Sequence, residues 1–270
     1  MKLAFSTLGC PDWTLERILN CAQENGYQAI ELRGLEGEMN IDKMPAFSAE
    51  NCASTLEQIH ARGLTISDLG SSASFHDAQK AEENYRTARA ELAACERCGI
   101  PYLRVFGNEI GDRDEAQTLA RISTYLKRLC EDARGTGVSV LLEIHGQINT
   151  IERVVRILEQ VNDEKLGILW DIEHSDKVYG DAFEPFYEAI RPWIRHVHIK
   201  DSYIDAQGER RLCAVGAGRL PIRAIVERML ADGYDGYFSL EWEKKWHPEL
   251  DEPETAFPAY AQWMRVSIKA

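Results

Sequence analysis

The sequence lacks the features that mark several common classes of protein. None of its apolar runs approaches the roughly 20 residues of a transmembrane helix. Its first residues lack the apolar region of a secretion signal, which predicts a cytoplasmic protein. Basic residues are scarce, with 31 Lys and Arg against 44 Asp and Glu and a formal net charge of −13. Because such a chain repels phosphate backbones and anionic lipids, we expect no nucleic-acid or membrane partner.

Two familiar motifs are missing or incomplete. The Cys95-x-x-Cys98 motif has no second pair nearby and lies in a helical stretch, which predicts ordinary buried cysteines. The odd total of seven cysteines suggests free thiols in a reducing compartment. No glycine-rich phosphate loop follows the first predicted strand, where Gly9 stands alone, so a doubly wound nucleotide-binding sheet is disfavoured. No linker divides the chain, and we expect a single domain over 1–270.

What the sequence does contain is a repeated alternation of apolar strand-like segments and amphipathic helical segments. The predicted strands are 2–7, 27–32, 64–67, 100–105, 138–143, 166–171, 194–199 and 237–241. The predicted helices are 14–25, 49–62, 78–98, 115–134, 151–161, 183–190, 220–231 and 255–266. The glycines expected near helix ends are Gly26, Gly63, Gly99, Gly137 and Gly236. Eight strands alternating with eight helices predict an α/β fold, a parallel (β/α)8 TIM barrel.

Four of the predicted strands end in a residue that can bind a metal ion. These residues are Glu143, Asp171, His198 and Glu241. Functional groups of such barrels gather at the carboxyl ends of the strands. The loops around them are expected to be the long irregular stretches that follow strands: 34–47, 70–77, 201–219 and 242–254. Three carboxylates and one imidazole suit Mn²⁺, Co²⁺ or Mg²⁺, with Zn²⁺ as a further candidate.

Several neighbouring polar residues are candidates for supporting roles. His196 and His198 point to the same face of one strand, and we assign the metal to His198 because it lies nearer the strand end. His196 is then expected one layer deeper, or as a hydrogen-bond partner of a ligand. The candidates for substrate contact are His145, His174, Lys200, Arg104 and Arg219, of which the two arginines carry the weaker signal.

These motifs resemble those of the xylose-isomerase-like TIM barrels of sugar phosphate isomerases and epimerases. The resemblance runs over nearly the whole chain and rests on short motifs: Glu143-Ile-His145, Trp170-Asp-x-x-His174, His196-Val-His-Ile-Lys-Asp201, Gly216-x-Gly218 and Ser239-Leu-Glu241. It implies that Glu143, Asp171, His198 and Glu241 bind a divalent metal and that the two glutamates act as acid and base. It also implies substrate contact at His174. Asn149 stands where ketose 3-epimerases of the family usually carry a second substrate-contacting glutamate.

The expected function is a metal-dependent isomerase or epimerase acting on a small sugar or polyol ketone. Glu143 and Glu241 would move a proton on the carbon next to the carbonyl, and the metal would act as a Lewis acid. A dehydratase of the inosose or dehydroshikimate type begins with the same step and is the first alternative. An endonuclease IV-like phosphodiesterase is disfavoured, because the sequence has no Asp-x-His after the seventh strand and is acidic overall. A sugar-binding barrel without catalysis and a homo-oligomeric state both remain open.

Overall fold

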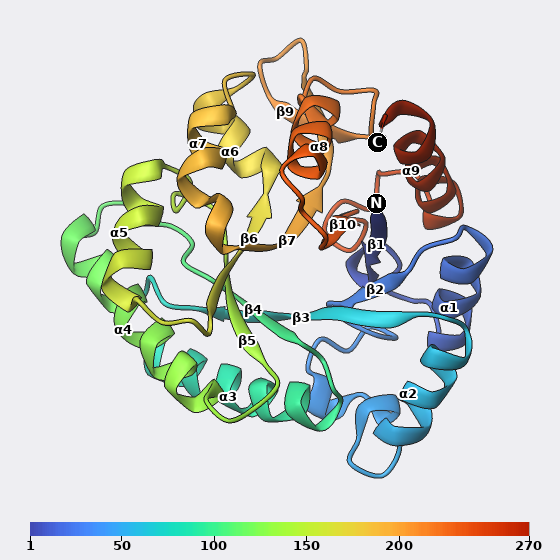
Figure 1. The fold of residues 1–270 in the computed structure, drawn as a ribbon, viewed down its shortest axis with the longest axis horizontal. Helices are drawn as coiled ribbons and strands as arrows, with labels where there is room; N and C mark the ends of the chain where they lie inside the picture. Colours follow the sequence, from blue (N-terminus) through green and yellow to red (C-terminus); the bar gives the residue numbers. More distant parts are fainter. Residues whose placement is uncertain (270) are drawn as a thin grey trace. The chain divides into compact units, whose positions relative to one another are not determined.

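The structure, a computed structural model, describes residues 1–269 and has the predicted (β/α)8 topology. The eight barrel strands are β1 (Lys2–Ser6), β2 (Ala29–Leu32), β3 (Thr65–Ser74), β4 (Tyr102–Phe106), β5 (Ser139–Glu143), β6 (Leu166–Asp171), β7 (Ile194–Ile199) and β10 (Tyr237–Leu240). Their order in the sheet is β1-β10-β7-β6-β5-β4-β3-β2, that of a closed barrel. Figure 1 labels these strands. The predicted fold class is therefore confirmed.

Nine α-helices occur among the described residues. They are α1 (Leu15–Glu24), α2 (Cys52–Ala61), α3 (Ala81–Arg97), α4 (Glu115–Ala133), α5 (Ile151–Val161), α6 (Ile172–Tyr179), α7 (Glu184–Ile190), α8 (Ile222–Ala231) and α9 (Pro253–Ser267). Eight of them, all except α6, match the predicted helices, and each of their boundaries differs from the prediction by no more than three residues. No described helix is long and apolar enough to cross a membrane.

The chain divides into two compact units, which we call the terminal unit (residues 1–67 and 196–269) and the central unit (residues 68–195). In the terminal unit, β1 pairs in parallel with β2 on one side and with β10 on the other, and β10 pairs with β7. In the central unit, β4 pairs with β3 and β5, and β5 pairs with β6. A single domain over 1–270 remains a prediction.

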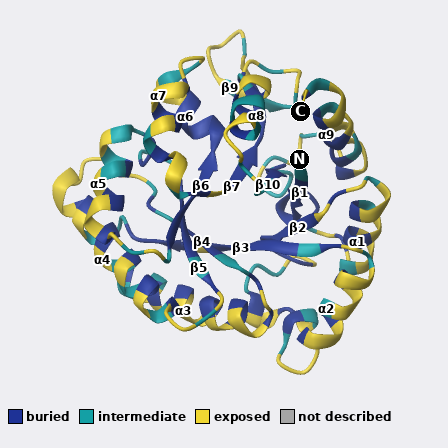
Figure 2. Cartoon of the chain, in the orientation of Figure 1, coloured by how far each residue is buried: buried dark blue, intermediate teal, exposed yellow. Residues whose placement is uncertain are grey.

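Each unit has its own apolar core. In the terminal unit, Phe5 of β1 stacks on Phe257 of α9 at 4.1 Å between ring centroids, and the Tyr27 hydroxyl donates to the Phe257 carbonyl at 2.6 Å. In the central unit, Trp170 of β6 stacks on Tyr187 of α7 at 5.7 Å. Figure 2 shows that, within each unit, the strands are mostly buried (dark blue) and the helices expose one face (yellow). Strands buried on both faces explain the nearly continuous apolar runs that predicted them.

Side-chain caps and left-handed residues set the helix boundaries. The Thr14 hydroxyl accepts a hydrogen bond from the Arg17 amide, which confirms its prediction as the N-cap of α1. Predicted helix-ending glycines with positive φ are confirmed at Gly26, Gly63 and Gly99. For α4 and α8, the left-handed glycines are Gly135 and Gly233, so the prediction of Gly137 and Gly236 was wrong. Helix α4 ends at Ala133 and α8 at Ala231, within one residue of their predicted ends, and those two glycines lie beyond the left-handed residue that ends each helix.

Three elements differ from the prediction. The segment 201–219, expected to be irregular, contains an antiparallel hairpin of β8 (Asp201–Ile204) and β9 (Arg210–Cys213). β3 continues to Ser74 through a stretch expected to be a loop. Its Ser-Ser-Ala-Ser sequence is too polar to signal a strand, but its backbone pairs with β4. Helix α6 was not predicted as an element; the Asp171 side chain caps its first turn by accepting from the Glu173 amide at 2.9 Å.

The cysteines are only partly as expected. Free thiols occur at Cys10, Cys21, Cys95, Cys130 and Cys213. Cys52 and Cys98 are instead disulfide-bonded, so the expectation of free thiols fails at these two residues and the interpretation of Cys98 as an ordinary buried cysteine was wrong. Cys95 is fully buried in α3, in agreement with its interpretation as an ordinary helix cysteine.

Candidate active site

The terminal unit brings His198 and Glu241 together at the ends of two neighbouring strands. His198 lies in β7, paired with Ser239 of β10, and Glu241 follows β10 directly. His198 is fully buried, and its Nδ1 lies 3.4 Å from Oε2 of Glu241. The parallel register that pairs β7 with β10 carries both side chains to the same strand ends. Two of the four predicted metal ligands are therefore neighbours within this unit.

Lys200 lies directly beside this pair. Its Nζ donates to Oε2 of Glu241 at 2.5 Å and to Oε1 of Glu243 at 2.6 Å, and its side chain is 3% exposed. We predicted Lys200 as a substrate contact, a role that stays a prediction. Glu243 was not predicted as a site residue, although its alternation with Glu241 in Glu-Trp-Glu was a usable signal, since alternate residues of an extended chain share a face.

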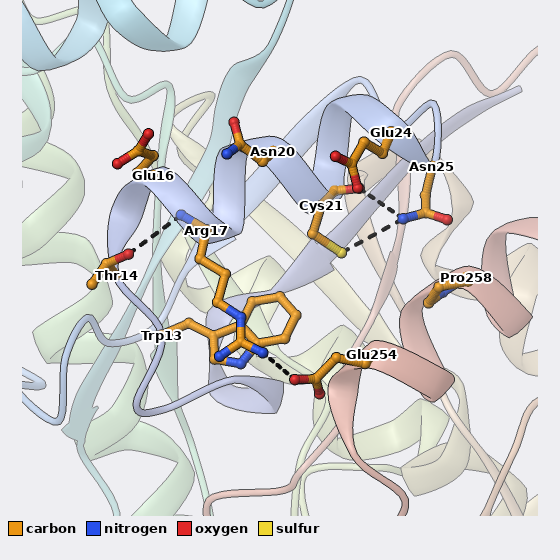
Figure 3. Close-up of a pocket in the computed structure, with 10 residues that line it drawn as sticks. All are labelled: Trp13, Thr14, Glu16, Arg17, Asn20, Cys21, Glu24, Asn25, Glu254 and Pro258. Carbon is orange, nitrogen blue, oxygen red and sulfur yellow. Dashed lines mark hydrogen bonds and ion pairs between the residues drawn. The ribbon is translucent and has the colours of Figure 1, made fainter.

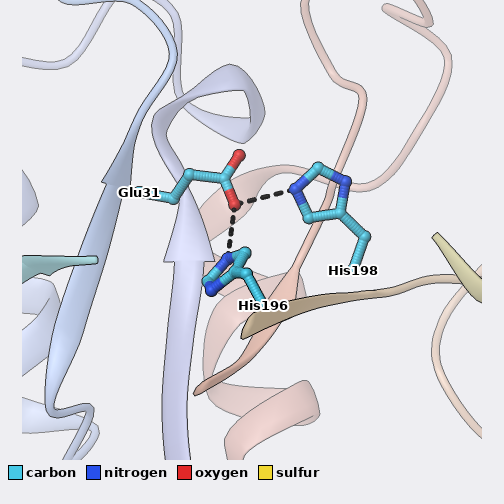
Figure 4. A group of neighbouring side chains, drawn as sticks. All are labelled: Glu31, His196 and His198. Carbon is cyan, nitrogen blue, oxygen red and sulfur yellow. Dashed lines mark hydrogen bonds and ion pairs between the residues drawn. The ribbon is translucent and has the colours of Figure 1, made fainter. Parts of the chain in front are cut away.

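A second buried cluster includes His198 and centres on Glu31 of β2 (Figure 4). Oε2 of Glu31 accepts from Nε2 of His198 at 2.9 Å, from Nε2 of His196 at 3.1 Å and from the Ser239 hydroxyl at 2.9 Å. All four side chains are fully buried. This cluster supports the expectation that His196 is a deeper hydrogen-bonding residue. Sequence reasoning missed Glu31, although a glutamate inside the apolar Ala-Ile-Glu-Leu strand is itself unusual.

The charges of these buried groups depend on one another. Burial alone would raise the pKa of Glu31, but His198 and the hydrogen bonds of both histidines hold this pKa well below its ordinary value. Burial likewise opposes ionisation of Glu241, yet His198 and Lys200 hold its pKa well below the ordinary value. For His198, burial lowers the pKa, and Glu241 and Glu31 raise it further than burial lowers it. The cluster therefore consists of ionised carboxylates held by cationic or proton-donating neighbours.

The central unit holds Glu143 and Arg104 as a buried ion pair. Nε of Arg104 lies 2.9 Å from Oε2 of Glu143, and each side chain is 1% exposed. The guanidinium also donates from Nη1 to the Ser71 carbonyl at 2.7 Å and lies over the Phe106 ring at 4.1 Å. We predicted Arg104 as a substrate contact. Its observed contacts fix the position of Glu143, and direct substrate contact stays a prediction.

Asp171, His174 and His145 gather at the neighbouring strand end. Asp171 is fully buried, and its Oδ2 lies 3.8 Å from Nε2 of His174. Nδ1 of His174 accepts from the Gly146 amide at 3.0 Å, and the His145 and His174 rings lie 4.1 Å apart. Asn149 supports this arrangement by donating to the His174 carbonyl at 3.0 Å. The two predicted substrate-contacting histidines thus lie side by side next to a predicted metal ligand.

Asp201, the first residue of β8, holds the loop that follows β9. Its carboxylate accepts from four backbone amides: those of Ser202, Gly216, Gly218 and Leu220. It therefore ties the loop after β9 to the end of β7, and this contact accounts for the Gly216-x-Gly218 motif in physical terms. Arg219, a predicted substrate contact, is exposed on this loop, and no described contact of its side chain joins it to the other predicted residues.

Gly218→Ala should destabilise the protein. A Cβ at this position would lie 2.1 Å from Oδ1 of Asp201 and 2.5 Å from the Ser202 carbonyl oxygen, so the loop must shift. Overpacking of this kind costs about 1–3 kcal/mol in free energy of unfolding. The matched control is Gly137→Ala, because a Cβ there meets nothing within 4 Å and φ is not positive. Urea denaturation compares the two; equal unfolding midpoints would contradict the anchoring role of Asp201.

A groove away from these residues lies between α1 and α9 of the terminal unit (Figure 3). It has a volume of about 480 Å³ and is lined by residues such as Trp13, Arg17 and Glu254. Arg17 stacks over the Trp13 ring at 4.3 Å and pairs with Glu254. None of the predicted site residues lines this groove, so it contributes nothing to the candidate active site.

The residues at the strand ends suit a divalent cation. Glu143, Asp171 and His198 are fully buried and Glu241 is 7% exposed, so their charges are removed from bulk water. Buried carboxylates are costly unless cations or hydrogen-bond donors compensate them. Carboxylate oxygens with one imidazole nitrogen match the ligand preferences of Mn²⁺, Mg²⁺, Co²⁺ and Zn²⁺. Clusters of buried His, Asp and Glu that could hold a metal ion are thus present in the described residues.

Comparison with known proteins agrees with this architecture. The sequence profile of the xylose isomerase-like TIM barrel family matches residues 19–266. A ketose 3-epimerase of Arthrobacter globiformis is 27% identical over 152 residues, covering 54% of this chain and 49% of the relative. An inosose dehydratase of Geobacillus thermodenitrificans is 29% identical over 135 residues, covering 44% of this chain and 45% of the relative. The chain thus spans about half the length of these curated relatives.

A solved structure agrees in fold over nearly its whole length. The crystal structure of the IOLI protein superposes with a TM-score of 0.80 at 20% identity, covering 99% of this chain and 98% of that one. That structure contains a bound zinc atom. At this level of identity the similarity establishes the fold only.

Proposed function

Because the chain belongs to the xylose isomerase-like TIM barrel family, we propose that it is a divalent-metal-dependent isomerase or epimerase. Its substrate would be a small sugar or polyol ketone. The reaction would begin with removal of a proton from the carbon next to the carbonyl. Similarity to a ketose 3-epimerase supports this reaction type.

The single observation that carries the proposal is the set of buried acidic and imidazole groups at the strand ends. Glu143 and Asp171 end adjacent strands of the central unit, and His198 and Glu241 lie on adjacent strand ends of the terminal unit. Active sites of (β/α)8 barrels are built at these carboxyl ends. We propose that the four residues bind one metal ion, with Mn²⁺, Co²⁺ or Mg²⁺ preferred and Zn²⁺ as a further candidate.

The bound ion would supply Lewis-acid chemistry, which makes a proton next to a coordinated carbonyl easier to remove. Glu241 would take that proton on its carboxylate, whose pKa His198 and Lys200 hold below its ordinary value. Glu143 would donate a proton back to the substrate, and Nε of Arg104 holds Oε2 of Glu143 in place. His145 and His174 would hydrogen-bond substrate hydroxyls. Burial of the carboxylates removes competing water from the transfer.

A dehydratase is the second candidate, and the similarity to an inosose dehydratase favours it. The same proton abstraction would be followed by loss of a hydroxyl from the adjacent carbon. The leaving hydroxyl takes the bonding electrons and a proton and departs as water, and a C=C bond remains. The same residues serve both reactions, so the product distinguishes them.

Incubation of the metal-loaded protein with keto-sugars and inososes in D₂O should place deuterium on carbon. The exchange follows from proton abstraction at the carbon beside the carbonyl, and NMR detects it. Exchange without loss of water supports the isomerase or epimerase, and a new C=C signal supports the dehydratase. If the abstracted proton is shielded from solvent, no deuterium enters carbon even though the abstraction occurs. A substrate deuterated at that carbon is the control for this case. Turnover at a normal rate with the label retained at its original carbon would exclude the proposed abstraction.

A further inference from the structure

The cluster around Glu31 has no role in the proton transfers proposed above. It lies inside the terminal unit, on strands β2, β7 and β10, and it is closed to solvent. A carboxylate fully buried among apolar strands is costly, so its presence calls for a physical reason. The contacts of Glu31 indicate one.

Three donors converge on one oxygen of Glu31. Oε2 accepts hydrogen bonds from Nε2 of His196 at 3.1 Å and from Nε2 of His198 at 2.9 Å (Figure 4). It also accepts one from the Ser239 hydroxyl at 2.9 Å. A carboxylate can only accept hydrogen bonds, so each of these imidazoles carries a proton on Nε2. For His198, this contact determines which of the two ring nitrogens remains for other chemistry.

The other nitrogen of His198 faces the proposed metal site. Nδ1 lies 3.4 Å from Oε2 of Glu241, which we propose as a fellow ligand. Neutral imidazole can bind a metal only through the nitrogen that lacks a proton, and a carboxylate on the opposite nitrogen selects that tautomer and orients the ring. The hydrogen bond from Nε2 to Glu31 keeps the proton on that nitrogen, so Nδ1, beside Glu241, is the nitrogen that would lose its proton to bind the metal.

We propose that Glu31 is a positioning residue: it holds His198 in the Nε2-protonated tautomer so that Nδ1 binds the metal. The inference rests on the proposed role of His198 as a ligand. His196, with Nε2 on the same oxygen, and Ser239 keep the carboxylate in place. In this proposal Glu31 acts only through His198 and has no direct part in the reaction.

Glu31→Gln should weaken metal binding without removing a metal ligand. The variant keeps the shape of the side chain but loses the charged acceptor, and losses of such hydrogen-bond partners weaken metal affinity by about 10–100-fold. Zn²⁺ titration by calorimetry measures the affinity and the stoichiometry. His198→Ala should lose the site altogether. Tyr260→Phe is the matched control, because it removes another buried hydrogen bond of the terminal unit, from the Tyr260 hydroxyl to the Phe238 carbonyl at 3.0 Å.

A direct measurement on the wild-type protein does not depend on the folding of any variant. Imidazole ¹⁵N NMR of the Zn²⁺-loaded protein should show His198 protonated at Nε2 and metal-bound at Nδ1. Coordination through Nε2 would overturn the inference, as would Glu31→Gln protein that binds Zn²⁺ as tightly as the Tyr260→Phe control. Two Zn²⁺ ions per wild-type chain and one in Glu31→Gln protein would also overturn it, by making the cluster a second metal site. If the wild-type chain takes up no metal, the proposed function fails together with the inference.

Discussion

Replacing Glu241 with Gln should lower turnover by about 10²–10⁴-fold, the usual contribution of a general base. The amide keeps the shape of the carboxylate but cannot accept a proton from carbon. Lys200 would also lose its partner at Oε2, although it keeps Glu243. The measurement is the rate of deuterium entry into carbon, at a metal concentration that restores full occupancy, so that weaker metal binding does not mimic loss of the base.

Glu243→Gln is the matched control for this experiment. It removes the second carboxylate that holds Lys200, at 2.6 Å, and leaves Glu241 in place. A much smaller loss of turnover is expected, because Glu243 has no proposed part in proton transfer. If both variants lose turnover by the same factor, the position of Lys200 rather than the carboxylate of Glu241 governs the rate. Glu241→Gln turnover within tenfold of wild type at full metal occupancy would refute the assignment of the base.

Arg104→Met should lower the free energy of unfolding of the metal-free protein by about 3–5 kcal/mol. Glu143 would then keep its charge inside the central unit without the guanidinium at 2.9 Å. The cost comes from the uncompensated buried carboxylate rather than from the lost attraction alone. Methionine retains much of the volume of the arginine stem, which limits cavity formation. Urea denaturation followed by circular dichroism gives the change.

Two further variants separate the charge effect from general damage. Arg153→Met breaks a pair with Glu115, whose side chain is 48% exposed, and should cost less than about 1 kcal/mol. Arg104→Met combined with Glu143→Gln removes both buried charges and should recover much of the lost free energy. If the double variant is no more stable than Arg104→Met alone, the buried charge is not the source of the loss.

The fold was predictable because each barrel strand is an apolar run that begins near a helix-ending glycine or polar turn. The repeat indicates the number and type of elements, since both faces of a parallel strand are buried. Helix ends were less predictable: Gly135 and Gly137 both precede the next strand, and only φ distinguishes them. The hairpin of β8 and β9 was missed because its strands are short and partly exposed, with no alternation strong enough to signal pairing.

The candidate site was predictable where a polar residue ends an apolar strand, as Glu143 and Asp171 do. Contacts across the sheet were not predictable. Glu31 lies 165 residues from His196 in sequence, and only the strand register brings their side chains together. The sequence made Arg104 one of the weaker candidates for substrate contact. Its pairing with Glu143 follows from the register of β4 against β5, which periodicity cannot supply.

The division of the chain into two units has a consequence for folding order. The central unit is continuous, so all its strand pairs form between segments near in sequence, whereas the terminal unit joins β1 and β2 to β7 and β10 across the whole of residues 68–195. Contacts of long sequence separation form late, because the loop that they close loses conformational entropy before any contact repays it. During synthesis, β1 and β2 leave the ribosome well before their partner β10. We expect the central unit to be organised first and the buried Glu31 cluster to be among the last parts of the molecule to form.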